Sequence, residues 1–588
     1  MVQLAVVLEE RLRAAFARAG IPGQFGAVRA SDRPDLADFQ CNDCMAAAKA
    51  MGKPPREVAQ SVVAAYQAID PVGAAQIEIA GPGFLNLVVG PGALNARMEA
   101  LSADPQAGLF TRPAPRRVVI DFCGPNVAKA MHVGHLRSTI IGDSLQRLFR
   151  ACGDHVTSDI HMGDWGLQMG QLIAGLAAEQ PDLPFFADGD GPFPAQSPVT
   201  LEDLERLYPL ASAQSKADPQ FRETARRATA QLQAGRPGYR ALWRHFVAVT
   251  RASLTRELAV LDVHFDLWKG ESDVDSIIAG MVDDLTARGL AERDAGALIV
   301  RVAEPTDKKD IAPLILLSSE GSALYHTTDL ATILDRRQSL DPDLFLYVVD
   351  QRQAEHFEQV FRAAAQAGYA PRDALEHIGF GTMNGPDGKP FKTRAGGVIK
   401  LADLIDSARD AARARLDQAG YGGELTAEDR DDVVEKVAIA AIKFADLINP
   451  RLSNYIFDLD KFVSFEGKTG PYLLYAAVRM NGVLRKAADN SIAPGAIALD
   501  HPAERKLALC LDAFTLATQQ AYDKRAPHGL ADHAFSLAQA FSSFWAACPI
   551  LQETDSNRRS SRLALTALAA RQLQIALDIL GIAVPARM

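Results

Sequence analysis

The segment from Asp121 to Arg137, DFCGPNVAKAMHVGHLR, holds side chains suited to binding phosphate. His132 and His135 flank Gly134 where a helix is expected to begin directly after a strand. A helix N-terminus presents unpaired N–H groups and a positive dipole, and two imidazoles there can donate hydrogen bonds to phosphate oxygens. Gly134 has no side chain, so a flat base can approach the backbone. Histidines also cap and pack helices routinely, so this tetrapeptide alone is weak evidence of function.

The elements around this segment predict its fold. Residues 118–122 form a short run rich in β-branched residues, which is typical of a buried parallel strand. Apolar residues then repeat at helical spacing from Leu136 to Phe149, which predicts a helix, and residues 156–162 are predicted to form the next strand. Strand, turn, helix and strand make a βαβ unit, so we predict an α/β fold with a doubly wound, Rossmann-like parallel sheet.

Other domains flank this unit. A helix over Leu4–Arg18, further helices around 46–49 and 61–68 and strands at 76–80 and 84–89 predict an α+β N-terminal domain, and a Pro- and Arg-rich linker follows it at 112–117. Sheet-like runs return at 298–302 and 344–349, and from Val433 onward the pattern is almost all helical. We therefore expect domains at 1–113, 114–380 (with a helical insertion at about 176–265), 381–456 and 457–588. The last is expected to bury its own core.

Composition excludes several classes of protein. With 48% hydrophobic and 23% charged residues the chain is not disordered, and its net charge of −10 argues against indiscriminate coating of nucleic acid. Six cysteines in 588 residues are too few for a disulfide framework. Cys41 and Cys44 form a Cys-x-x-Cys pair with no partner ligands at zinc-like spacing, so we interpret them as buried residues on one helix face and expect no structural zinc.

No membrane segment is expected. Charged residues at positions 9–13 interrupt any secretory signal. The uncharged stretch 533–552 repeats its apolar residues at helical spacing, which predicts a one-faced packing helix ending before Pro549. We expect a cytoplasmic monomer.

Several motifs together resemble one enzyme family. The tetrapeptide 132–135 resembles the "HIGH" signature of class I aminoacyl-tRNA synthetases, and residues 125–129 and 135–143 around it closely resemble arginyl-tRNA synthetases. Further matching segments follow in the family's order at 163–168, 324–330, 353–357 and 388–396. The resemblance covers nearly the whole chain. It implies ATP-dependent activation of L-arginine to arginyl-adenylate and transfer to the 3′-terminal adenosine of tRNA(Arg).

The chemistry of arginine agrees with this resemblance. A guanidinium is planar and always charged, and carboxylates beside an aromatic wall hold it well. Tyr325 and Asp329 would share one face of a helix, and the resemblance makes them readers of the guanidinium, with Glu271 as the second carboxylate. Without the family resemblance, Glu271 would be interpreted as a solvated loop residue. The resemblance assigns the α-amino and carboxylate end of arginine to Asn126 and Gln353, and Asp121 ends its strand at the same place.

The mobile "KMSKS" loop of class I enzymes corresponds here to residues 391–396, FKTRAG, which lack the second lysine. Relatives with this lack carry a lysine before the "HIGH" box, where Lys129 stands; a solvent-facing turn lysine is the alternative. The resemblance thus implies a set of catalytic, charge-stabilising residues: His132, His135, Lys129, Lys392 and Arg394. ATP, which brings Mg²⁺ with it, is expected to contact Val133, Gly134, Phe391 and Thr393.

The helical C-terminal region resembles the family's anticodon-binding domain. Unpaired bases can stack on aromatic and cationic side chains, and the candidates here are Tyr472, Tyr475, Arg479, Phe541 and Trp545. Helical spacing predicts a core position for most of these aromatics equally well. The N-terminal domain is expected to touch the outer corner of the tRNA. Alternatives are a class I synthetase for another amino acid, a small nucleotidyltransferase and a catalytically inactive tRNA-binding paralogue.

Overall fold

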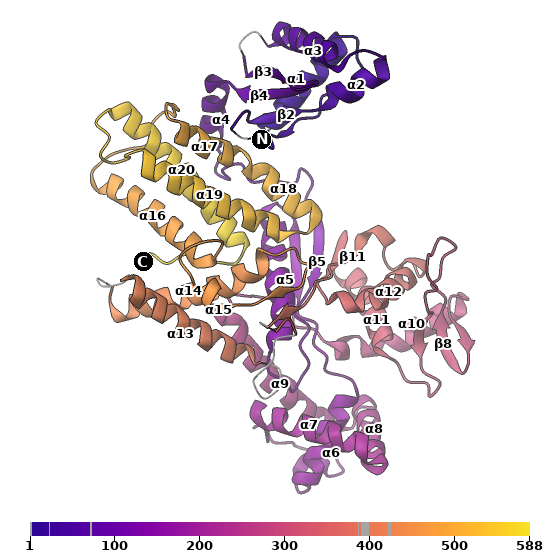
Figure 1. Ribbon diagram of the computed structural model, residues 1–588. Coiled ribbons are helices and arrows are strands. Elements are labelled where there is room, and N and C mark those ends of the chain that lie inside the picture. The colour runs from indigo at the N-terminus through magenta and orange to yellow at the C-terminus, as the bar shows by residue number, and fades with distance from the viewer. Residues whose placement is uncertain are drawn as a thin grey trace.

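The computed structural model describes residues 3–22, 24–33, 35–70, 73–385, 387–389, 399–420 and 425–588. Four predicted site residues, Phe391, Lys392, Thr393 and Arg394, lie outside these ranges. The described chain forms an α+β N-terminal domain, a central parallel sheet with helices on both sides, and a helical C-terminal region (Figure 1).

The N-terminal domain is built on an antiparallel sheet with the strand order β1-β2-β4-β3. Its elements, together with the helix that follows, are α1 (Leu4–Arg18), β1 (Arg29–Ala30), β2 (Phe39–Cys41), α2 (Asp43–Met51), α3 (Pro55–Ile69), β3 (Ala75–Ala80), β4 (Phe84–Val89) and α4 (Pro91–Ala103). Cys41 and Cys44 are both buried. Cys41 ends strand β2, so its predicted place on a helix face is wrong, because the helix begins two residues later.

The central sheet has the order β11-β10-β5-β6, and all its pairs are parallel. Its strands and the helices around them are β5 (Arg117–Asp121), α5 (Val133–Ala151), β6 (His155–Asp159), α11 (Tyr325–Ser339), β10 (Leu344–Tyr347), η3 (Gln351–Gln353), α12 (Ala354–Gln366), η4 (Arg372–Ala374) and β11 (Leu375–His377). Alternate residues of β10 enter different cores: Leu344 and Leu346 face the core that contains α5, and Phe345 and Tyr347 face the core that contains α11 and α12. Apolar side chains thus cover both faces, which confirms the doubly wound α/β fold.

Two insertions interrupt the sheet. The first contains α6 (Leu167–Glu179), η1 (Pro184–Phe186), α7 (Leu201–Ala217), α8 (Pro219–Gln233) and α9 (Pro237–Val260), with a separate core around Phe246. The second contains η2 (Glu271–Val274), α10 (Asp275–Ala287), β7 (Glu292–Asp294), β8 (Ala297–Val300) and β9 (Leu314–Leu317). The sheet-like run at 298–302 does not rejoin the parallel sheet, because β8 pairs antiparallel with β7 and β9.

The rest of the described chain is almost entirely helical. It contains β12 (Met383–Asn384), α13 (Leu401–Ala419), α14 (Ala427–Leu447), β13 (Tyr455–Ile456), α15 (Leu459–Phe462), α16 (Gly470–Asp489), α17 (Pro502–Asp512), α18 (Phe514–Lys524), α19 (Pro527–Ala547) and α20 (Ser556–Ile579). Helix α19 ends before Pro549, as predicted. No helix in the described residues is long and apolar enough to span a bilayer.

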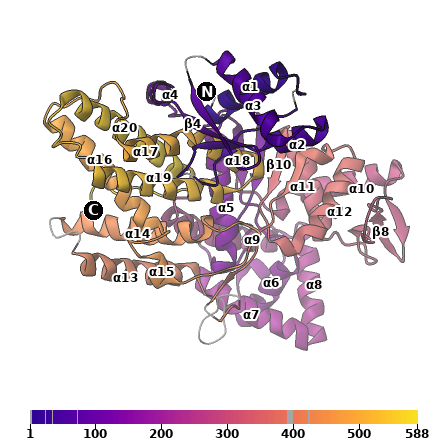
Figure 2. The ribbon, with the colours of Figure 1, turned by 45° about the horizontal axis from the view of Figure 1, so that its top comes forward.

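The C-terminal helices do not form a separate core, so that prediction is wrong. One continuous cluster of buried apolar residues runs from the N-terminal domain through α5 and α14 to α20. Buried polar contacts reinforce it: Arg97 of α4 pairs with Asp512 of α17 at 2.6 Å, and Lys443 of α14 donates to the backbone oxygen of Gly581 at 2.7 Å. The N-terminal domain accordingly lies beside α17 in both ribbon views (Figure 2).

We predict that Gly142→Ala destabilises the protein although alanine favours helices. A Cβ at position 142 of α5 would lie 2.2 Å from Cγ of Phe122, whose side chain is fully buried. Overpacking of this kind costs about 1–3 kcal/mol, more than the roughly 1 kcal/mol gained in helix propensity. Gly280→Ala in α10, where a Cβ meets nothing within 4 Å, is the matched control and should be neutral or stabilising. Equal denaturation midpoints for both variants would contradict this packing.

Candidate functional site

Buried hydrogen bonds attach the turn between β5 and α5 to the central sheet. Cys123 and Ala128 both have positive φ, at 77° and 67°. The Oγ of Ser138 in α5 accepts a hydrogen bond from the Cys123 N–H at 2.9 Å and donates one to the Val348 oxygen at 2.6 Å. A buried hydroxyl therefore joins the turn, α5 and the end of β10, and so fixes where α5 begins.

His132 and His135 cap the N-terminus of α5 reciprocally. The Gly134 N–H donates to Nδ1 of His132 at 3.0 Å, and the His132 N–H donates to Nδ1 of His135 at 3.3 Å. The ring centroids are 4.0 Å apart. A Cβ on Gly134 would lie 2.6 Å from Cε1 of His132, so any larger residue at position 134 would displace the His132 ring. Because both Nδ1 atoms accept, each ring carries its proton on Nε2.

Both imidazoles are neutral near pH 7. Burial, followed by the charge of Lys129, lowers the pKa of His132. The pKa of His135 falls to about 3, mainly through burial and then through His132 and Lys129. Two neutral N–H donors at a helix N-terminus suit an anionic ligand, and they add no charge that must be desolvated.

Two other segments meet this helix end. Lys129 places Nζ 4.7 Å from the centre of the Tyr208 ring, which belongs to α7 in the first insertion. The Val133 N–H donates to the Ile399 oxygen at 3.1 Å, and the Leu401 N–H donates to the Met131 oxygen at 3.0 Å. The chain that follows the predicted KMSKS-like segment therefore pairs directly with the segment before α5.

The structure places the predicted carboxylates Glu271 and Asp329 near enough for the charge of Asp329 to act on Glu271. Glu271 begins η2, and its Oε2 accepts from the Trp165 N–H at 3.4 Å. Burial raises the pKa of Glu271 to about 6, and the charges of Asp164 and Asp329 add to the rise while His161 opposes it. A desolvated carboxylate beside others is a site prepared for a cation.

Tyr325 and Asp329 lie one turn apart at the start of α11, as their spacing predicted. The Tyr325 side chain is exposed, and Asp329 is half-buried. Gln353 ends η3 just before α12, on the exposed side of the loop that follows β10. Asn126 forms a parallel bridge with Gly163 in the strand-like segment that follows β6. These four predicted residues follow the carboxyl ends of the central strands or begin the neighbouring helix.

Asp121 has a partner that the sequence did not reveal. Its Oδ2 accepts from Nη2 of Arg336 at 2.6 Å, and the same nitrogen lies 2.8 Å from Oδ2 of Asp159 at the end of β6. Arg336 is fully buried in α11. Any contact of Asp121 with a substrate would therefore use its other oxygen.

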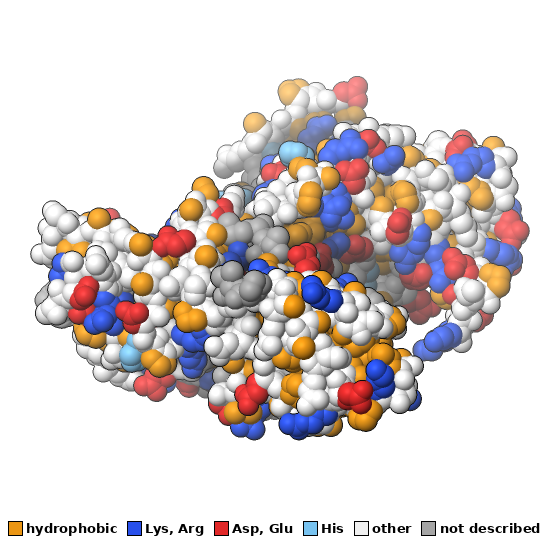
Figure 3. All heavy atoms as spheres, turned by 90° about the horizontal axis from the view of Figure 1, so that it is seen from above, with side chains coloured by type: hydrophobic (Ala, Val, Ile, Leu, Met, Phe, Trp, Pro, Cys, Tyr) orange, Lys and Arg blue, Asp and Glu red, His pale blue; other side chains and the backbone are white. Residues whose placement is uncertain are grey.

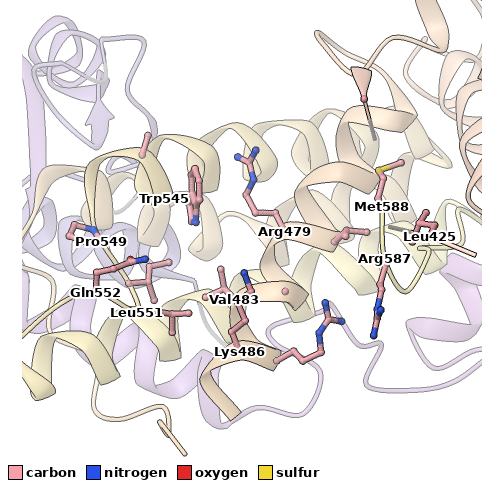
Figure 4. Close-up of a pocket in the computed structure, with 16 residues that line it drawn as sticks. Leu425, Arg479, Val483, Lys486, Trp545, Pro549, Leu551, Gln552, Arg587 and Met588 are labelled. Atoms are coloured by element: carbon pink, nitrogen blue, oxygen red, sulfur yellow. The ribbon is translucent and has the colours of Figure 1, made fainter. Parts of the chain in front are cut away.

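A second site lies in the C-terminal helices (Figure 4). A cavity of about 1150 Å³ is lined by Arg479, Arg485, Lys486, Trp545 and Arg587, among others, and none of its described side chains is acidic. The guanidinium of Arg479 lies 4.3 Å from the Tyr475 ring centre and 4.5 Å from that of Trp545. The cavity is therefore cationic and aromatic, whereas charges of both signs are interspersed on the face of the molecule that Figure 3 shows.

The other predicted aromatics differ in exposure. Tyr472 is half-buried, with its hydroxyl 3.4 Å from Ser542 Oγ and its ring against Phe535. Phe541 is fully buried, as its helical spacing equally allowed. Only Arg479 and Trp545 of the predicted tRNA-binding residues line the cavity.

We predict that His135 does not titrate between pH 5 and 8, because its pKa is lowered to about 3. Nuclear magnetic resonance of ¹⁵N-histidine-labelled protein should show a neutral ring protonated at Nε2 throughout, with His135→Asn identifying the signal. A His135 resonance that titrates near the ordinary histidine pKa of about 6.5 would contradict the buried capping geometry.

Comparison with known proteins places the whole chain in one family. Models of the "tRNA synthetases class I (R), catalytic domain", the "DALR anticodon binding domain" and the "Arginyl tRNA synthetase N terminal domain" match residues 98–459, 473–588 and 5–89. The chain is 56% identical to the arginine–tRNA ligase of Maricaulis maris (strain MCS10), covering 100% of this chain and 99% of that one. It is 55% identical to that of Hyphomonas neptunium (strain ATCC 15444), covering 100% of both.

A solved structure has the same fold. The arginyl-tRNA synthetase of Plasmodium falciparum superposes with a TM-score of 0.81 at 22% identity, and the match covers 100% of both chains. The ordered motifs, the geometry at the carboxyl edge of the sheet and these full-length relatives lead to one conclusion. The chain belongs to the arginyl-tRNA synthetases, a family of class I aminoacyl-tRNA synthetases.

Proposed function

We propose that this enzyme activates L-arginine with ATP to arginyl-adenylate and transfers the arginyl group to the 3′-terminal adenosine of tRNA(Arg), as a cytoplasmic monomer. The observation that carries the amino-acid assignment is that the charge of Asp329 acts on the buried carboxylate of Glu271, while the exposed ring of Tyr325 lies one helical turn before Asp329. Two carboxylates match the fork of a guanidinium, and an aromatic face covers its plane. The ammonium of lysine is a point charge and cannot satisfy both carboxylates in the same way.

The adenylate-forming step needs fixed donors around the α-phosphate. When the carboxylate of arginine attacks that phosphorus, negative charge grows on its oxygens, and pyrophosphate leaves. His132 and His135 offer neutral Nε2–H donors at the N-terminus of α5, and Lys129 adds a positive charge. Lys392 and Arg394 would contribute from the KMSKS-like segment, and Val133, Gly134, Phe391 and Thr393 would contact ATP. Mg²⁺ would accompany the nucleotide. We assign no protein general base.

The other end of arginine would face the turn after β5. Asn126 and Gln353 are proposed to bind its α-amino and carboxylate groups, with Asp121 behind them. The support is their position: Asn126 follows β5 and Gln353 follows β10, the neighbouring strand. Ligands of open α/β sheets bind outside the carboxyl ends of such strands.

The tRNA is proposed to contact the C-terminal helices through Tyr472, Arg479 and Trp545, and the N-terminal domain would touch its outer corner. The cationic cavity beside Arg479 supports this role, because bases can stack on Trp545 while phosphates meet the arginines. We also propose that the four sequence ranges 1–113, 114–380, 381–456 and 457–588 correspond to tRNA-contacting, catalytic, connecting and anticodon-binding parts.

The experiment that tests the proposed function is a set of charging assays with each amino acid and total tRNA. Arginine should be charged, and kcat/KM for lysine should be about 10⁴-fold lower, because its ammonium leaves buried acceptors unpaired. Comparable values for the two amino acids would overturn the arginine assignment. Charging of no amino acid would favour an inactive tRNA-binding paralogue.

We predict that Lys129→Ala lowers kcat by ~10²- to 10³-fold and hardly changes KM for arginine, because its interaction belongs to the transition state. Tyr208→Phe, which keeps the ring beneath the ammonium, is the control and should retain activity. The measurement is the pre-steady-state rate of adenylate formation with tRNA present. If Lys129→Ala forms adenylate at a rate within threefold of wild type, this lysine is a solvent-facing turn residue without a catalytic role.

Trp545→Ala should weaken tRNA binding without affecting arginine. Loss of one base-stacking surface costs about 1–3 kcal/mol, or roughly 5- to 150-fold in KM for tRNA. Leu516→Ala, which shortens an exposed apolar side chain on α18, is the matched control. Equal tRNA KM values for Trp545→Ala and wild type would remove Trp545 from the proposed interface.

A further inference from the structure

We propose that His356 is a positioning residue for the amino-acid pocket: it orients Asp329 and Tyr325 together and thereby sets the affinity for arginine. This inference rests on the proposed function of those two residues. His356 lies in the first turn of α12, on a different element from both. It was not among the site residues predicted from the sequence.

One imidazole contacts both side chains. Nε2 of His356 lies 2.5 Å from Oδ2 of Asp329. Its ring centroid lies 4.8 Å from that of Tyr325, with a 44° angle between the planes. The His356 side chain is 10% exposed, and that of Asp329 is 23% exposed. The contact is therefore largely protected from water, where a hydrogen bond orients its partners most strongly.

The geometry also fixes the direction of this hydrogen bond. An ionised carboxylate can only accept, so Nε2 of His356 donates. The other ring nitrogen, Nδ1, is buried and has no hydrogen-bond partner among the described residues. Among the described residues, His356 is therefore hydrogen-bonded through Nε2, and this bond holds Asp329 through one of its two oxygens.

The His356 ring also belongs to a cluster of aromatic rings. It lies 5.0 Å from the Phe357 ring, and Phe357 in turn stacks in parallel on His377 at 5.3 Å. Nε2 of His377 lies 3.1 Å from the Val349 oxygen, which belongs to the backbone after β10 and not to the Asp329 or Tyr325 side chain. His377 therefore offers a matched control: a neighbouring histidine in the same aromatic cluster, outside the pocket.

The test uses substitutions that distinguish the contribution of the hydrogen-bond donor of His356 from that of its ring. His356→Phe keeps a ring but no donor, and His356→Gln keeps an N–H donor but no ring. KM for arginine and kcat are measured for both, alongside Asp329→Asn, His377→Asn and the double variant of His356→Phe with Asp329→Asn. His356→Leu replaces His356→Phe if that protein does not fold.

We expect His356→Phe to raise KM for arginine about tenfold, as loss of a hydrogen bond to a charged group does, with kcat changed less than threefold. His356→Gln should recover part of this affinity. In the Asp329→Asn background, His356→Phe should add nothing further. His377→Asn should leave both constants unchanged.

Each contrary result has a distinct meaning. If Asp329→Asn leaves KM for arginine unchanged, the proposed arginine pocket itself is wrong. If Asp329→Asn raises KM but His356→Phe does not, only the positioning role of His356 is overturned. Full additivity in the double variant would also overturn it, because His356 would then act independently of Asp329.

Discussion

The balance of charge at the carboxyl edge of the central sheet is the constraint on which the site depends. β5 and β6 both end in a buried aspartate, Asp121 and Asp159, and one fully buried guanidinium lies between them. That cation belongs to Arg336 of α11, so the ion pairs join two strands to the helix that carries Tyr325 and Asp329. Removing Arg336 would leave two buried carboxylates without compensation, and breaking a buried ion pair in this way typically costs about 3–5 kcal/mol. The arrangement is therefore fixed before any substrate binds.

Arg336 does not neutralise all the carboxylates at the carboxyl edge of the central sheet. Asp164 and Glu271 lie near the same His161 and receive hydrogen bonds mainly from neutral groups, so burial raises the pKa of each. Asp329 is a further carboxylate at this edge, and its Oδ2 lies 2.5 Å from Nε2 of His356. The carboxylates of the pocket therefore lack one neutralising cation. Under the proposed function, the substrate guanidinium would supply to Glu271 and Asp329 what Arg336 supplies to Asp121 and Asp159, and a planar, permanently charged group would fit there better than an ammonium.

The sequence predicted those features that depend on local periodicity. The strand–turn–helix–strand unit around residues 118–162 and the face shared by Tyr325 and Asp329 follow from spacing alone. Contacts between distant segments were not predictable in this way, because no local pattern shows that Arg336 pairs with a residue 215 positions earlier. The run at 298–302 does contain a strand, β8, but its antiparallel partners could not be predicted, because a short apolar strand has the same composition in a parallel sheet and in an antiparallel one. The C-terminal helices were also expected to bury their own core, because helical spacing identifies a buried face but not the segment that packs against it.

The most direct test of this account is the release of protons when arginine binds. Glu271 has a pKa of about 6 before a cation arrives, and a bound guanidinium favours its ionised form. Calorimetric titration of arginine in buffers of different ionisation enthalpy should therefore detect release of roughly half a proton per site near pH 6, and almost none at pH 8. Glu271→Gln should abolish the release. Arginine binding at pH 6 without proton release would contradict a desolvated carboxylate pair as the arginine site.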